Sequence, residues 1–212
     1  MPSYVSQVFG SIVGESRVRA LETVARALMG EDPAHGWPHV ERVLELASRI
    51  VVEEGLEKSS VDLLALYLSI LLHDIGRFAS KGRRHAVESA RIARELVMIA
   101  WSNEDLAKAV EHAILSHSYS MGIAPETLEA KILSDADKLD ALGAIGIARV
   151  FHTGRSLGRS FADSIEHFKE KILKLPDMMH FEWSRREAKR RARRVELFLS
   201  WWLEESGASS DS

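Results

Sequence analysis

The chain has 212 residues, of which 46% are hydrophobic and 28% charged, and its formal net charge at pH 7 is −3. A chain of this length buries well over half of its unfolded surface and needs no covalent staple, and its slightly acidic balance argues against a nucleic-acid partner. The absence of cysteine excludes disulfides and thiolate metal ligands, and it is consistent with a reducing compartment.

Apolar residues recur along nearly the whole chain at spacings of three and four, which is the period of an amphipathic helix. The expected helices cover about 17–29, 38–54, 61–75, 86–97, a segment starting after Asn103, 125–151, 160–173 and 183–205. Ser59 or Ser60 offers an N-cap hydroxyl for the third of these, and Asn103 offers a cap for the fifth. The valine-rich pieces keep helical spacing, so no strand is expected.

The pattern predicts an all-α protein with one main domain. We expect an N-terminal helical segment at 1–31 that packs on this domain, the domain itself at 32–205, and a disordered tail at 206–212. The N-terminus lacks a basic start followed by a long apolar run, so no signal peptide is expected. The most apolar stretch, 61–72, is too short to span a bilayer. These features predict a cytoplasmic protein without a membrane partner.

Histidine and aspartate side chains stand at unusual places in this pattern. His35 and His39 flank the start of one expected helix, while His73 and Asp74 end the most apolar one. Three aspartates crowd the run SDADKLDA inside an apolar helical pattern: Asp135, Asp137 and Asp140. An aspartate near a core is costly unless it is paired or binds a cation. Imidazole and carboxylate are ligands for hard or borderline divalent metals, so a mixed catalytic metal site is one interpretation.

Each of these features also has a plainer interpretation. His39 alone is typical of an ordinary first-turn histidine. The His73-Asp74 pair could be a helix C-terminus with a local salt bridge, and the aspartate run could be a solvated face. Their joint appearance in this order is what favours a shared site.

Three motifs in this order, HGWPHVERV, LLHDIGR and DADKLDALGAIGIAR, resemble those of the HD-domain metal-dependent phosphohydrolases. The likeness is closest to the YedJ-like branch of small single-domain members and spans about residues 32–203. An HD pair alone is a weak signal, but HxxRV before it and DADxLDA after it make the match specific. The resemblance implies an all-helical fold with a metal in a cleft between helices. It also implies the metal ligands His39, His73, Asp74 and Asp137.

The resemblance further implies a divalent cofactor, which could be manganese, iron, nickel, cobalt, magnesium or zinc. One ion is expected and a second is an alternative, because some branches of the family bind two through extra histidines. His85, His112 and His117 occupy the corresponding interval here. Since His112 and His117 would point about 140° apart on a continuous helix, we favour His85 and His117 as pocket residues that contact the substrate.

The expected chemistry is hydrolysis of a phosphoester of a small molecule, foremost a nucleotide, by a metal-activated water. Either Asp74 or a free carboxylate nearby is the expected proton acceptor. Arg77 and Lys138 are expected to stabilise charge on the phosphoryl group, and His35 and Arg155 are weaker candidates for substrate contacts.

Alternatives remain open for the function. The chain could be an HD-fold metal or ligand sensor with little turnover, or a phosphodiesterase for cyclic nucleotides or dinucleotides. The basic run 184–194 could bind nucleic acid, but a solvated helix face is the favoured interpretation. A homodimer is also an open alternative.

Overall fold

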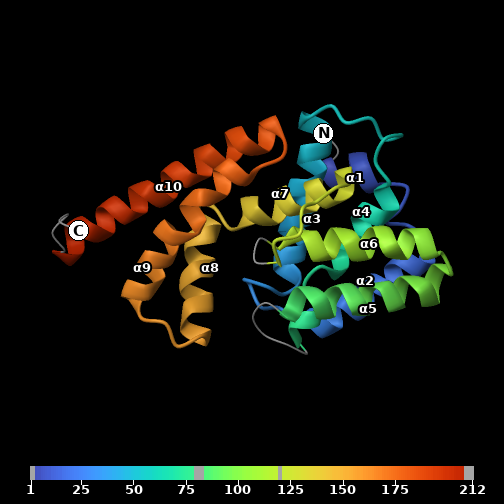
Figure 1. Cartoon of the computed structure of the whole chain (residues 1–212), viewed down its shortest axis with the longest axis horizontal. Coiled ribbons are helices and arrows are strands. Elements are labelled where there is room, and N and C mark those ends of the chain that lie inside the picture. The colour runs from blue at the N-terminus through green and yellow to red at the C-terminus, as the bar shows by residue number, and fades with distance from the viewer. Residues whose placement is uncertain (1–2, 79–83, 119–120, 208–212) are drawn as a thin grey trace. The chain divides into compact units, whose positions relative to one another are not determined.

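The computed structural model describes residues 3–78, 84–118 and 121–207, and in these ranges every regular element is a helix (Figure 1). The all-α prediction is therefore confirmed. The helices are α1 (Tyr4–Phe9), α2 (Ser16–Met29), α3 (Trp37–Glu53), α4 (Leu63–Leu72), the 3₁₀ helix η1 (Ile75–Phe78), α5 (Arg84–Trp101), α6 (Glu104–His117), α7 (Leu128–Asp140), α8 (Gly143–Ser156), α9 (Phe161–Glu170), the 3₁₀ helix η3 (Ile172–Met178) and α10 (Glu182–Ser206).

The chain divides into two compact units, Met1–Asp137 and Lys138–Ser212. The predicted division into 1–31, 32–205 and a tail at 206–212 stays a prediction. Of that tail, Ser206 ends α10 and Gly207 follows it in the left-handed conformation, with a φ of 65°. Residues 208–212 lie outside the described part of the chain.

Helix α4 forms the centre of the first unit. Every residue from Ala65 to Leu72 is buried, and the helix packs against α3, α5 and α6. A helix that is apolar on all sides belongs in a core. Asp62 caps its start by accepting the N–H of Ala65, so the predicted cap at Ser59 or Ser60 was wrong. Because α4 is buried along its length, the His73-Asp74 pair at its end is delivered into the interior of the unit.

The turn that follows this pair lies directly against α5. A Cβ on Gly76 would come within 2.5 Å of the Ser89 nitrogen and 2.8 Å of the His85 carbonyl oxygen. The Gly76 N–H also donates to the Ser89 hydroxyl over 2.9 Å. Only glycine allows this close approach, which brings η1 and α5 together at the site.

The second unit contains α8, α9, η3 and α10. Phe168 is fully buried, whereas Phe161 is 67% exposed. Both belong to a group of five aromatic side chains with edge-to-face or tilted contacts: Phe151, Phe161, Phe168, Phe198 and Trp202. The helix predicted over 125–151 was wrong in one respect, since α7 ends at Asp140 and α8 starts at Gly143. Gly143 has a φ of 72°, a left-handed conformation that interrupts the helix.

The last residues of α7, from Lys138 on, belong to the second unit and are held within it by arginines. Arg191 of α10 donates to the Leu139 carbonyl over 2.8 Å, and Arg149 of α8 pairs with Asp140 at 2.7 Å. These contacts hold the last turn of the helix that also carries Asp137.

Candidate metal centre

His39 lies in the first turn of α3, where the chain enters the helix from a tight loop. Pro38 occupies the start of the helix, where its missing N–H costs nothing. Before it, the Asp32 carboxylate accepts the backbone N–H groups of Ala34 and His35, each over 2.9 Å. This local bonding fixes the loop and turns the fully buried His39 ring into the first unit.

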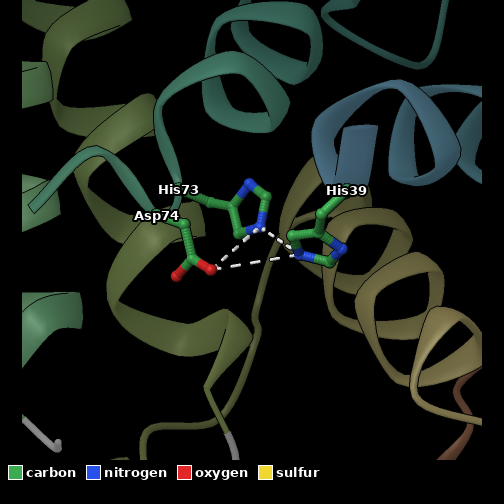
Figure 2. Close-up of side chains that lie close together, drawn as sticks. All are labelled: His39, His73 and Asp74. Atoms are coloured by element: carbon green, nitrogen blue, oxygen red, sulfur yellow. Dashed lines mark hydrogen bonds and ion pairs between the residues drawn. The ribbon is translucent and has the colours of Figure 1, made fainter. Parts of the chain in front are cut away.

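Three buried side chains from two parts of the chain meet at one point (Figure 2). The Nε2 atoms of His39 and His73 are 3.1 Å apart. Asp74 Oδ2 lies 4.0 Å from each of them. Their donor atoms all fall within 4.8 Å of one another, so one ion could contact all three.

Asp137 of α7 belongs to the same cluster. Its Oδ1 lies 3.4 Å from His39 Nε2, and its side chain is 28% exposed, whereas those of His39 and Asp74 are at most 2% exposed. The structure therefore places Asp137 beside His39, next to the three buried residues whose donor atoms all lie within 4.8 Å of one another. Asp137 stands at the more open side of the group.

Hydrogen bonding sets the tautomer of His73. Its Nδ1 lies 2.8 Å from the Ile70 carbonyl oxygen, which can only accept, so Nδ1 carries the proton. The lone pair of Nε2 then faces His39 and Asp74. Burial lowers the pKa of His73 to about 4, with the nearby Asp74 charge opposing this shift. His73 is consequently neutral near pH 7, which is the form that binds metal.

Asp74 is the most electrostatically constrained member. Burial raises the pKa of its carboxyl, but the Arg77 guanidinium and the two neighbouring histidines outweigh this and hold the pKa well below its usual range. Arg77 Nε is 2.6 Å from Asp74 Oδ2. The other oxygen, Oδ1, is buried and has no hydrogen-bond partner among the described residues. An ionised carboxylate that is buried without a full set of hydrogen bonds fits a site that binds a cation.

A second group of possible ligands shares Asp74 with the first. It consists of Asp74, His85 of α5 and His117 at the end of α6, all buried and with donor atoms within 4.8 Å. His117 bonds through Nδ1 to the Ile114 carbonyl and, like His73, turns Nε2 away from its own helix. His112, whose role the sequence left open, instead accepts the Glu126 N–H over 3.1 Å.

The remaining candidates differ in their relation to this cluster. The His35 ring lies 6.3 Å from that of His39. Lys138 follows Asp137 directly in α7, but it belongs to the second unit. Arg155 lies in the last turn of α8 and is exposed. The proposed roles of these residues stay predictions.

Sequence reasoning overlooked two supports of the site. The role of Arg77 towards the substrate stays a prediction, but its pairing with Asp74 was not foreseen. Sequence reasoning also passed over Ser89, whose hydroxyl holds the turn after the HD pair. The three-residue spacing of Asp74 and Arg77 was a visible signal for the first. No local signal marks Ser89.

Two imidazoles and two carboxylates are a donor set for a hard or borderline divalent ion. Metal–nitrogen bonds of about 2.1 Å can join two nitrogens as close as those of His39 and His73 to one ion. An all-helical fold with such a buried cluster is typical of metal-dependent hydrolases. The chain matches the HD domain over residues 36–142, and it belongs to the HD-domain family.

Individual relatives agree with this assignment. Protein YpgQ of Bacillus subtilis (strain 168) is 32% identical over 178 residues, which cover 79% of this chain and 82% of YpgQ. A crystal structure from Lactobacillus plantarum is similar with a TM-score of 0.78 and 25% identity, covering 93% of this chain and all of that one. An HD-superfamily hydrolase from Bacillus thuringiensis has a TM-score of 0.66 and 29% identity, with coverage of 91% and 98%. The structure of YpgQ in complex with ADP matches with a TM-score of 0.69 and 24% identity, with coverage of 89% and 97%.

The YedJ-like branch stays a prediction, because these relatives establish the family and not the branch. No helix in the described part of the chain is long and apolar enough to cross a membrane.

Proposed function

We propose that this chain hydrolyses a phosphoester of a small molecule, foremost a nucleotide, with the help of a divalent metal ion. The observation that carries the proposal is the buried convergence of His39, His73 and Asp74, with Asp137 beside them (Figure 2). Such a group would be unfavourable in a core without a cation to bind. A nucleotide is the favoured substrate because the relative YpgQ has been crystallised with ADP.

The residues of the site would have two roles: some would bind the ion, and others would accept a proton or stabilise negative charge. His39, His73, Asp74 and Asp137 would hold it, and when bound it supplies water of lowered pKa near neutral pH. Asp74 or a free carboxylate nearby would accept a proton, and the lowered pKa of Asp74 makes its own carboxylate the weaker base of the two. The Arg77 guanidinium, about a third exposed beside the cluster, can reach towards phosphoryl oxygens. Lys138, His35, His85, His117 and Arg155 are proposed as further contacts to the substrate.

The first test removes one ligand. Asp74→Asn keeps the shape of the side chain but loses its charge, so metal retention and phosphate release should both fall by about two orders of magnitude or more. Bound metal is measured by elemental analysis, and turnover is measured on nucleotides and sugar phosphates with and without manganese and chelator. Asp177→Asn, at an exposed position of η3, is the matched control and should change neither. Full activity in Asp74→Asn would remove the proposed site.

The same screen separates the alternatives. Metal binding without turnover on any phosphoester would identify a sensor. Preference for cyclic nucleotides or dinucleotides over linear ones would identify a phosphodiesterase. Salt-dependent retention on DNA or RNA that chelator does not affect would favour the basic run of α10 instead.

A further inference from the structure

The Asp74 carboxylate faces two different groups of ligands. Oδ2 lies 4.0 Å from the Nε2 atoms of His39 and His73, while Oδ1 lies 3.5 Å from His85 Nε2. With His117, these side chains form two groups that have only Asp74 in common. By geometry alone, the cluster resembles a pair of adjacent cation sites bridged by one carboxylate.

A cation of the protein itself already lies between the two groups, in contact with the Asp74 oxygen that faces the first group and with His85 of the second. Arg77 is held by a short turn after Asp74, where its backbone N–H donates to the Asp74 carbonyl over 3.0 Å. Its Nε is 2.6 Å from Asp74 Oδ2 and its Nη2 is 3.2 Å from His85 Nε2. The guanidinium therefore contacts two of the three residues that would bind a second ion.

The contact with His85 shows which way the imidazole lone pair points. A guanidinium has N–H donors only and does not lose its proton in proteins. The short contact to Nη2 therefore makes His85 Nε2 the acceptor. The lone pair that would ligate a metal is used by Arg77. The contact with Asp74 is of a different kind, since Arg77 Nε lacks hydrogen-bond geometry despite the 2.6 Å separation and acts as a nearby charge.

We propose that the Arg77 guanidinium is the resident cation of the second group, so that the native chain binds one divalent ion at His39, His73, Asp74 and Asp137. Asp74, His85 and His117 become a metal site only when the guanidinium is removed. This inference rests on the proposed function for its first site. It gives Arg77 the charge-neutralising position that a second ion would otherwise take, and the hydrolase then depends on a single metal.

The test is the number of metal ions bound per chain. Metal-free protein is titrated with manganese by calorimetry, and metal retained after gel filtration is counted by elemental analysis. Wild type should bind one equivalent and Arg77→Ala two. Electron paramagnetic resonance of manganese-loaded Arg77→Ala should show two spin-coupled ions, whereas wild type should show an isolated one. Arg77→Gln, which keeps more of the side-chain volume, should behave as Arg77→Ala does.

Two control variants test whether the additional metal ion binds at the second group. Arg77→Ala combined with His85→Ala should return to one equivalent. Arg91→Ala removes an arginine that pairs with Glu88 and Glu95 on the surface of α5, and it should leave one equivalent. Circular dichroism checks that each variant is folded.

Three results would overturn the inference. Two equivalents in wild type would mean that Arg77 excludes nothing. One equivalent in folded Arg77→Ala and Arg77→Gln would mean that the second group does not bind metal. If these variants bound that single manganese ion more tightly than wild type, Arg77 would instead compete with metal at the first site. No metal in wild type would count against the proposed function itself, which distinguishes the two failures.

Discussion

His73 and His117 each turn the Nδ1 side of the ring towards a carbonyl one turn earlier in their own helices. This bond places the proton on Nδ1 and presents the lone pair of Nε2 to the cluster. Because His73 Nε2 is thus an acceptor, His39 Nε2 is the donor across their 3.1 Å contact. Metal binding then requires only that His39 transfer its proton to Nδ1. The ligand geometry is set by helix ends that exist before any ion arrives.

Glu187 of α10 binds Arg191, and Arg191 in turn contacts α7, the helix that carries Asp137. The Glu187 carboxylate accepts from Arg190 over 2.7 and 2.8 Å and from Arg191 over 2.7 Å. Burial raises the pKa of this carboxyl, but the two arginines lower it by more, so that it falls from 4.5 to about 2. Arg191, fixed in this way, donates to the Leu139 carbonyl. The ionised carboxylate is therefore part of the support for α7.

Glu187→Gln should reduce the free energy of unfolding at pH 7 by about 1.5 to 3 kcal/mol, the usual contribution of hydrogen bonds to a charged group. Since the pKa is lower in the folded than in the unfolded state, this stability is present above pH 4.5 and is lost as the pH falls towards 2. Urea unfolding at pH 7, 5 and 3.5 should show wild type and variant converging on acidification. Glu196→Gln, exposed on the same helix, is the control. A difference that does not shrink with pH would contradict this role.

At the level of elements, helical periodicity predicted most helices because each buries one face against a neighbour. It failed between α7 and α8 because apolar residues continue in register through the break. Gly143 was the local hint, but a glycine within a helical pattern is often tolerated. Its left-handed φ shows that the chain turns there, and a Cβ at this position would lie 3.5 Å from the Arg191 side chain. That contact depends on α10, which is distant in the sequence.

Part of the candidate site could also be predicted from the sequence. The motif order singled out His39, His73, Asp74 and Asp137, because the helix ends that carry them are marked by short local patterns. Helix geometry favoured His85 and His117 over His112, but it could not decide whether they bind metal or substrate, since that depends on which way each side chain turns in the folded unit. His112 is turned to the Glu126 N–H, a contact that no local pattern indicates.

The packing of η1 on α5 provides a prediction at this scale. Gly76→Ala would place a Cβ against the backbone of α5 near Ser89 and His85. Such overpacking should cost about 1 to 3 kcal/mol in unfolding free energy. It should also weaken manganese binding, because Asp74 immediately precedes the displaced turn. Thermal unfolding and metal titration measure the two effects. Gly14→Ala, where no atom lies within 4 Å of the added Cβ, should be neutral in both. Unchanged metal affinity in Gly76→Ala would show that the turn does not position Asp74.

At the scale of the whole molecule, the ligands are distributed unevenly between the two units. His39, His73, Asp74 and Asp137 all lie within Met1–Asp137, and so do His85 and His117. Only Lys138 and Arg155 among the candidate residues belong to Lys138–Ser212. An ion that binds the folded form raises the free energy of opening for the part of the chain that must be folded to bind it. Metal should therefore protect the first unit above all.

Hydrogen exchange can test this asymmetry. With free manganese at about 100 times its Kd, binding stabilises by about 2.7 kcal/mol, so the slowest amides of the first unit should exchange about 100-fold more slowly. The buried residues of α4 are the natural reporters, because their amides exchange only when the core opens. Amides of α9 and α10 in the second unit should slow much less. Asp74→Asn should abolish the protection of α4. Equal protection of both units would show that they open together, and protection confined to the second would place the metal elsewhere.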